Sequence, residues 1–264
     1  MGASRRIVAT VSATAVKLYS AAFVARWGPM QNPGCTIEDE GLRGVVPGAE
    51  DSAARLLVTD DHAHDALAAV LPHARAGMIR VFETAERCVE LVADQLGWGS
   101  DTVTAMVCRD LNAVPRLLIP DDLTLQPVRR LAEDRADGVA LADAVAVAVA
   151  AAPAIKDPPG VLAQFLRTLP STFRLLAAVD SGGTVRATSG FGVFGCYATV
   201  IFVNTDRDWR GRGIGRAMSA HALIAAQRAG ARQASLDASD AGRSLYRRLG
   251  FEIAGSVKRF IGPG

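Results

Sequence analysis

The residues best suited to chemistry form a short segment rich in glycine and arginine, Arg210-Gly211-Arg212-Gly213-Ile214-Gly215. A strand-like pattern precedes it and a helical pattern follows, so the segment is predicted to be a turn that opens a helix. Such a turn directs several backbone N–H groups and the positive end of the helix dipole at one point. Glycine lets an anion approach the backbone, and arginine offers forked, charged donors. We therefore expect residues 210–215, called the glycine turn, to bind phosphate.

Two other phosphate-binding motifs share features with the glycine turn. A P-loop requires Lys and then Ser or Thr after its last glycine, and neither follows Gly215. A dinucleotide-binding fingerprint requires a third Gly or Ala, but Arg216 or Met218 stands there, depending on which glycine is counted first. Asp237 lies where that fold places its ribose-binding acid, so a nicotinamide-dependent oxidoreductase stays an alternative. Too few residues follow Asp237 to complete a doubly wound sheet.

The hydrophobic pattern predicts the elements that must position the glycine turn. Strands are expected at 123–128, 173–180, 184–194, 196–204, 233–237 and 252–260. Helices are expected in two Ala-rich stretches after residue 128, the second at 161–169, and at 214–229 and 241–249. The three central strands form an antiparallel meander, and a helical crossover follows it. This order indicates an α/β (α+β) fold with a mixed sheet flanked by helices.

A second motif, Leu245-Tyr246-Arg247-Arg248-Leu249-Gly250-Phe251, lies about thirty residues after the glycine turn, with a helix and a strand between. The two motifs resemble the Arg/Gln-x-x-Gly-x-Gly/Ala pyrophosphate signature and the C-terminal Leu-Tyr-x-x-x-Gly-Phe of the GNAT superfamily of N-acetyltransferases. The resemblance covers roughly the last 140 residues. It implies a splayed sheet, acetyl-CoA as cosubstrate, and direct transfer of the acetyl group to a primary amine. Ser239 and Thr205 depart from the family's frequent Asn and Pro.

The resemblance also implies roles for individual residues. Tyr246 holds the position of the general acid that protonates the thiolate, although a tyrosine packed in the core explains it as well. The backbone near Val203 is similar to the strand that stabilises the thioester oxygen. None of Asp206, Asp208 and Asp237 is distinguished as a general base. The expected cofactor-binding residues are Val203, Arg210, Gly211, Arg212, Gly213, Ile214, Gly215 and Arg216. A non-catalytic acyl-CoA-binding regulatory module remains the alternative.

Composition and charge narrow the remaining functions. The net charge is +2, with 11 basic against 14 acidic residues before position 121 and 18 against 13 after it. This excess is too scattered for a nucleic-acid-binding surface, and we expect none. The four cysteines form no Cys-x-x-Cys pair, and the acids and histidines of 60–65 fit a helix start, so we expect no metal. His221 is expected to be a core histidine.

The N-terminal half repeats the order of the last 60 residues, with strands near 54–60, 78–82 and 102–109 and helices at 62–74 and 84–96. Asp60 and Asp61 stand where the glycine turn should be. We therefore expect a degenerate GNAT-like or accessory domain at 1–120 and the acetyl-CoA-binding domain at 121–264. Lys17 and Arg26 interrupt the first apolar stretch, so no membrane segment is expected and the chain is expected to be cytoplasmic. The acceptor amine, a small molecule or a protein, and the oligomeric state are left open.

Overall fold

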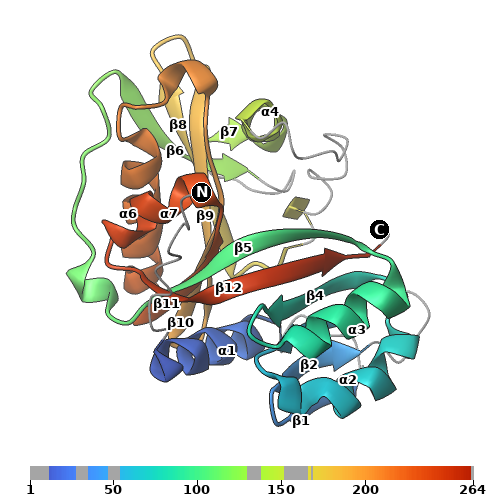
Figure 1. The fold of residues 1–264 in the computed structure, drawn as a ribbon. Helices are drawn as coiled ribbons and strands as arrows, with labels where there is room; N and C mark the ends of the chain where they lie inside the picture. The colour runs from blue at the N-terminus through green and yellow to red at the C-terminus, as the bar shows by residue number, and fades with distance from the viewer. Residues whose placement is uncertain are drawn as a thin grey trace, which may run out of the picture. The chain divides into compact units, whose positions relative to one another are not determined.

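The computed structural model describes residues 12–27, 35–46, 54–129, 138–151, 166–167 and 169–262. The chain divides into two compact units (Figure 1). The first unit contains the residues up to Val107 together with Asp237–Arg243 and the segment from Glu252 onward. The second contains Cys108–Leu236 and Ser244–Phe251. No helix of the described residues is long and apolar enough to cross a membrane.

The first unit is built on a sheet with the strand order β1-β2-β3-β4-β12-β5. Neighbouring strands are antiparallel except β3 and β4, which are parallel because α2 crosses over between them. Its elements are α1 (Ala13–Trp27), β1 (Cys35–Asp39), β2 (Leu42–Val46), β3 (Ala54–Val58), α2 (His64–Val70), β4 (Gly77–Phe82), α3 (Glu86–Leu96), β5 (Gly99–Cys108) and β12 (Glu252–Ile261).

Helices cover both faces of this sheet. On one face, Leu56, Ile79 and Phe260 are buried in a core that also holds the apolar residues of α2 and α3. On the other face, Leu57 packs with Tyr19 of α1. Successive residues of a strand point to opposite faces, which is why neighbouring Leu56 and Leu57 enter different cores.

The last strand of the chain, β12, lies inside the sheet of the first unit. Val257 pairs with Phe82 of β4 on one side and with Val103 of β5 on the other, and all three are buried in the core beside α1. The compact units therefore do not follow a single division at residue 120, because residues near the C-terminus complete the sheet formed by the N-terminal part. Apolar alternation predicts a strand at 252–260 but does not identify its partners.

The predicted repeat of elements is present in the structure. The order β3–α2–β4–α3–β5 matches the later order strand–helix–strand–helix–strand that ends in β12. At the start of the earlier helical segment, the side chain of Asp60 accepts a hydrogen bond from the His62 N–H at 3.1 Å. A carboxylate of the protein thus occupies the position at which an anion would meet this helix start. The origin of the two halves by duplication stays a prediction.

The second unit is built on a mixed sheet with the strand order β11-β10-β9-β8-β6-β7. The central strands pair antiparallel, while β10 and β11 pair parallel across the crossover α6. This arrangement confirms the predicted mixed fold and differs from the parallel sheet of a dinucleotide-binding domain. Its elements are β6 (Leu123–Arg129), β7 (Val139–Ala140), α4 (Leu141–Ala151), β8 (Phe173–Asp180), β9 (Val185–Phe194), β10 (Tyr197–Thr205), α6 (Ile214–Arg228), β11 (Gln233–Ala238) and α7 (Asp240–Arg247).

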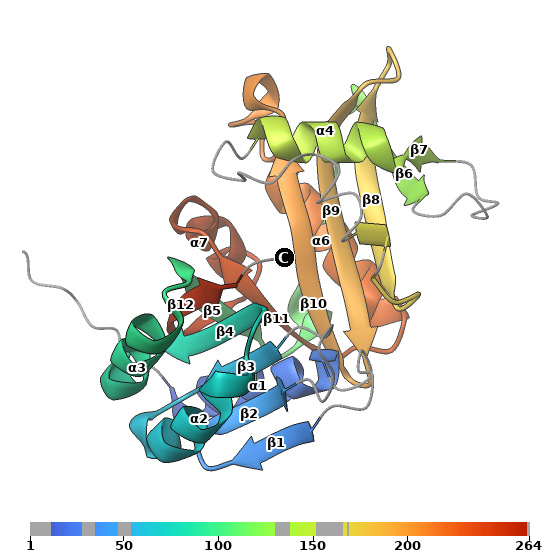
Figure 2. The same ribbon diagram turned by 90° about the vertical axis from the view of Figure 1, so that its right-hand side faces the viewer.

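Two helices cover the meander. Ile214 and Met218 of α6 pack against Ala178 and Ala187 of the sheet. Helix α4 contacts β9 and β10, and Figure 2 shows it crossing the strands on the face opposite α6. Nearly every residue of β9 is buried because both faces are covered. The helix predicted at 161–169 lies for the most part outside the described residues.

Candidate functional site

The site begins where β10 and β11 stop pairing. The parallel ladder joins only Tyr197–Thr199 of β10 to residues 233–235 of β11, although both strands continue. Beyond it, the pairing of β10 with β9 jumps from Ile201 to Asn204, which leaves Phe202 and Val203 in a bulge. Phe202 has a φ of 56°, and its carbonyl accepts a hydrogen bond from the Thr188 hydroxyl at 2.9 Å. The backbone of Val203 therefore lies in a stretch diverted from the sheet.

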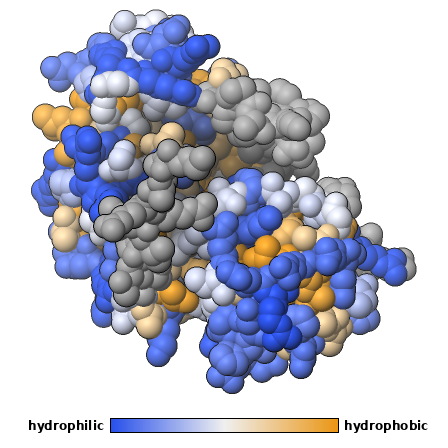
Figure 3. Space-filling model, viewed as in Figure 1, coloured by the Kyte–Doolittle hydropathy of each residue, from blue (hydrophilic) through white to orange (hydrophobic). Residues whose placement is uncertain are grey.

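The glycine turn joins this diverted strand to α6. A 3-10 turn at Arg207–Trp209 leads into it, and Gly211 and Gly213 have φ values of 81° and 77°. These left-handed conformations suit glycine. A Cβ atom built on either residue meets nothing within 4 Å, so the space beside both glycines is open. In Figure 3 the top of the view, which lies above the start of α6 in Figure 1, is hydrophilic.

No side chain at the N-terminus of α6 accepts a hydrogen bond from the first N–H groups of the helix. Gly213 is the N-cap residue and makes no side-chain capping bond, and the first turn contains no acidic residue. The first N–H groups of this 15-residue helix therefore combine with its dipole as a donor site for an anion. Ile214 contributes only its backbone, because its side chain is buried in the core. A Cβ on Gly215 would lie 3.3 Å from the Thr205 hydroxyl oxygen and 3.4 Å from the Leu245 side chain, so Gly215 lies close to both residues.

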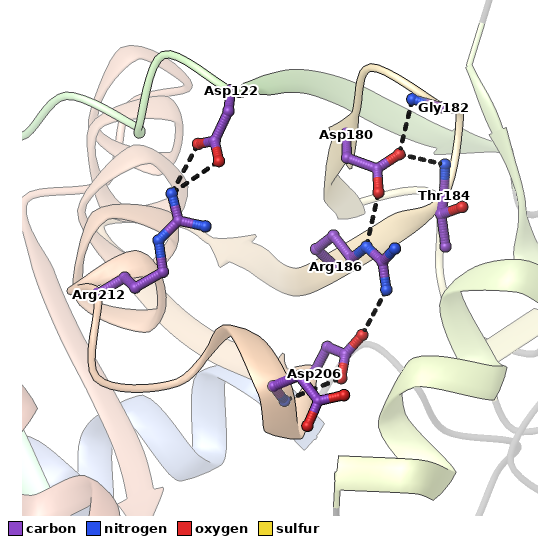
Figure 4. A network of polar contacts seen from close by, with 8 residues as sticks. Asp122, Asp180, Gly182, Thr184, Arg186, Asp206 and Arg212 are labelled. Atoms are coloured by element: carbon purple, nitrogen blue, oxygen red, sulfur yellow. Dashed lines mark hydrogen bonds and ion pairs between the residues drawn. The ribbon is translucent and has the colours of Figure 1, made fainter.

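The three arginines of the glycine turn and the first turn of α6 are not equivalent. Arg210 donates from Nε to the Thr205 carbonyl at 3.1 Å. Arg212 donates from one nitrogen to both carboxylate oxygens of Asp122 at 2.8 Å, as Figure 4 shows. Arg216 is half-buried, and within the described part of the chain its guanidinium makes no hydrogen bond or ion pair. Arg212 is therefore shared with the protein, which the sequence did not indicate.

A network around Arg186 lies beside the glycine turn and was not predicted (Figure 4). Arg186 bonds Asp180 at 2.7 Å and Asp206 at 2.8 Å. The N–H of Thr184 and the Arg186 guanidinium hold the pKa of Asp180 below its usual value, and the two carboxylates raise the pKa of Arg186. The sequence gives little sign of this network, because Arg186 in β9 lies twenty positions before Asp206. Only the polar residues next to the turn could have indicated it.

Tyr246 is buried, with 8% of its surface exposed, and its ring meets that of Phe251 edge to face at 5.8 Å. The side chain of Ser219 in α6 lies close enough to affect the pKa of the Tyr246 hydroxyl. Ser219 donates to the Gly215 carbonyl at 2.9 Å, so the polar neighbour of the phenol is fixed to the first turn of α6. Burial raises the pKa of Tyr246 to about 12, and the phenol keeps its proton at neutral pH.

The other candidate residues are engaged elsewhere. Asp237 accepts hydrogen bonds from the Tyr19 hydroxyl and from Arg80 Nε, at 3.2 Å for the latter, and lies 4.0 Å from Arg259. These contacts within the first unit give it a structural environment. His221 has a buried Nε2 that makes no hydrogen bond within the described residues. Among the described residues, no group of three or more His, Cys, Asp or Glu side chains is arranged to hold a metal ion.

Comparison with known proteins agrees with this geometry. Residues 171–253 match the acetyltransferase (GNAT) domain family, and this stretch contains the bulge, the glycine turn and Tyr246. A GCN5-related N-acetyltransferase from Kribbella flavida superposes with a TM-score of 0.61 at 18% identity, covering 95% of this chain and 96% of its own. A GCN5-related N-acetyltransferase-like protein from Streptococcus suis gives 0.52 at 17% identity, covering 93% and 97%. These likenesses show the fold. No curated protein gives a significant sequence match.

Proposed function

We propose that the chain moves an acetyl group from acetyl-CoA to a primary amine, because residues 171–253 match the acetyltransferase (GNAT) domain family, which supports acyl transfer in general. The observation that carries the proposal is the start of α6. Its first N–H groups have no side-chain cap, and the space beside Gly211 and Gly213 is open. A pyrophosphate satisfies these donors and matches the dipole at the same point.

The residues of the turn fit a CoA pyrophosphate. The backbone N–H groups from Gly211 to Gly215 supply neutral donors, and the guanidinium of Arg216 supplies charge beside them. Arg210 is exposed and adds its positive charge to the turn, and its Nε donates to the Thr205 carbonyl. Arg212 contributes its charge in competition with Asp122. The thioester supplies the activated acetyl group.

Two groups of the chain serve the transfer itself. The amine nitrogen attacks the thioester carbon, and the backbone N–H of Val203 stabilises the negative charge that develops on the carbonyl oxygen. The carbon–sulfur bond then breaks, and the sulfur leaves as a thiolate that takes the hydroxyl proton of Tyr246. Because burial raises its pKa to about 12, the phenol keeps its proton at neutral pH and can donate it to the thiolate. The amine gives up its own proton to water, and the tyrosinate regains a proton from water.

The acceptor is a small-molecule amine or an amine of a protein, and the chemistry is the same for both. One observation favours a second function. Tyr246 is buried against Phe251, as expected for a residue whose role is packing. In that case the chain is a non-catalytic acyl-CoA-binding regulatory module, which binds the cosubstrate and releases no thiol.

Release of the CoA thiol from acetyl-CoA in the presence of a panel of amines distinguishes the two functions. We expect acceptor-dependent release, reduced about a hundredfold in Tyr246→Phe, which is the contribution typical of a general acid. Tyr197→Phe is the matched control, since Tyr197 is a half-buried tyrosine at the start of β10, and it should retain full activity. Binding without release for any amine would assign the regulatory module instead.

A further inference from the structure

Trp209, the last residue before the glycine turn, is contacted by two arginines. The guanidinium carbon of Arg186 lies 5.2 Å from the indole centroid and that of Arg212 lies 4.5 Å from it. The indole also packs against the core that contains Ile214 and Met218 of α6. Its position therefore sets where the glycine turn begins relative to the helix that follows.

Arg186 ties the residue that starts the 3-10 turn to the neighbouring strands. It donates from Nε to Asp180 and from Nη1 to Asp206, and its carbonyl accepts the Asp206 N–H at 2.8 Å. Asp206 then organises the turn that follows. Its carboxylate accepts the Asp208 N–H at 3.2 Å, and its carbonyl accepts the Trp209 N–H at 3.0 Å.

The charges of this network oppose the function of the turn beside it. Asp180 and Asp206 carry two negative charges against the single positive charge of Arg186. Carboxylates next to a phosphate site lower the local potential and weaken anion binding by repulsion. Despite this electrostatic cost the network has a mechanical role, because the guanidinium of Arg186 links β9 to two other segments, through Asp180 and Asp206.

We propose that Arg186 is a positioning residue for the cosubstrate: through Asp206 and Trp209 it holds the glycine turn in the conformation that receives a CoA pyrophosphate. The identity of the ligand as CoA rests on the proposed function. The effect of Arg186 on the conformation of residues 207–213 does not require a ligand, so it can be measured in the ligand-free chain.

Replacing Asp206 separates an electrostatic role from a positioning role, because the two roles predict opposite changes in the affinity for CoA. Asp206→Asn removes the ion pair with Arg186 while an amide oxygen still caps the turn. It also removes a negative charge, so electrostatics alone predicts tighter binding of CoA. Positioning by Arg186 predicts weaker binding, by about tenfold, the size expected for loss of a charge-assisted hydrogen bond. Asp208→Asn is the matched control, because Asp208 is exposed and its carboxylate does not contact Arg186.

The experiment combines calorimetric titration of CoA with amide hydrogen exchange of the ligand-free chain over residues 205–216. We expect Asp206→Asn and Arg186→Met to bind CoA about tenfold more weakly and to exchange the amides of 207–213 at least about fivefold faster. Asp208→Asn should bind as well as the native chain or slightly better, with unchanged exchange. Arg186→Lys keeps the charge but bonds one carboxylate at a time, and its affinity should fall between native and Arg186→Met.

The outcomes separate the two proposals. One outcome is that Asp206→Asn exchanges faster but the native chain does not bind CoA. This outcome would support positioning of the turn and overturn the proposed function. Native-like exchange and affinity in Asp206→Asn and Arg186→Met would overturn the positioning role while leaving acetyl transfer intact. Asp180→Asn acts at the far end of the network and should reproduce the faster exchange, provided that its melting temperature stays close to native.

Discussion

The buried hydroxyl of Tyr246 makes the stability of the protein depend on alkaline pH. An exposed tyrosine ionises near pH 10, as it does in the unfolded chain, whereas burial raises the pKa of Tyr246 in the folded protein to about 12. Between these values the unfolded chain loses the proton and the folded one keeps it. The contribution is therefore fully present below pH 10 and is lost as the pH rises toward 12.

The magnitude follows from the difference in pKa. A shift of about two pKa units corresponds to about 2.7 kcal/mol of unfolding free energy when the loss is complete, and to about half of that at pH 11. Replacement by Phe removes the titrating group and the polar interaction of its hydroxyl with Ser219. We expect Tyr246→Phe to be less stable than native by about 1 kcal/mol at pH 8 and nearly as stable at pH 11.

Urea unfolding followed by circular dichroism at pH 8, 10 and 11 measures the effect. The burial of Cys88 also raises its pKa to about 12, but Cys88 is present in both proteins and cancels in their difference. Tyrosinate absorbance provides an independent measure, since two of the three tyrosines remain in the variant. A stability difference between native and Tyr246→Phe that stays constant from pH 8 to 11 would refute the described environment of the phenol.

Three further predictions concern residues of both units. Gly213→Ala forces a Cβ into a left-handed conformation at φ 77° and should cost about 1–2 kcal/mol in urea unfolding, with no clash to relieve. Asp237→Asn leaves buried Arg80 without its carboxylate and should cost about 3–5 kcal/mol; a loss below 1 kcal/mol would show that the pair is solvated. Gly77→Ala places a Cβ 2.1 Å from the Ala54 carbonyl oxygen and should abolish cooperative unfolding of the first unit, which near-UV circular dichroism would detect.

The sequence predicts most of the local structure around the site. The helix expected at 214–229 is observed at Ile214–Arg228, and the one expected at 241–249 is observed at Asp240–Arg247. These elements are set by short-range signals, namely apolar periodicity and the glycines at their ends. The glycine turn could be located for the same reason, because its conformation depends on glycines that are visible in the sequence.

Long-range features could not be predicted in this way. The alternation of 252–260 is compatible with any half-buried strand, so the position of β12 between β4 and β5 depends on partners about 150 residues away or more. The Arg186 network could not be predicted either, because no sequence pattern shows which acidic residues an arginine in a strand pairs with. Asp237 shows the reverse case. Its spacing from the glycine turn is that of a ribose-binding acid, and in the structure it bonds Tyr19 and Arg80.

The central claim is that CoA phosphates bind the glycine turn at the start of α6. Isothermal titration of acetyl-CoA into the native chain tests it, with NAD as the control ligand and the double variant Arg210→Ala, Gly213→Asp alongside. The account predicts saturable binding of acetyl-CoA, no binding of NAD, and loss of acetyl-CoA binding in a folded double variant. A folded native chain that does not bind acetyl-CoA, or a double variant that binds it as tightly as native, would contradict the account.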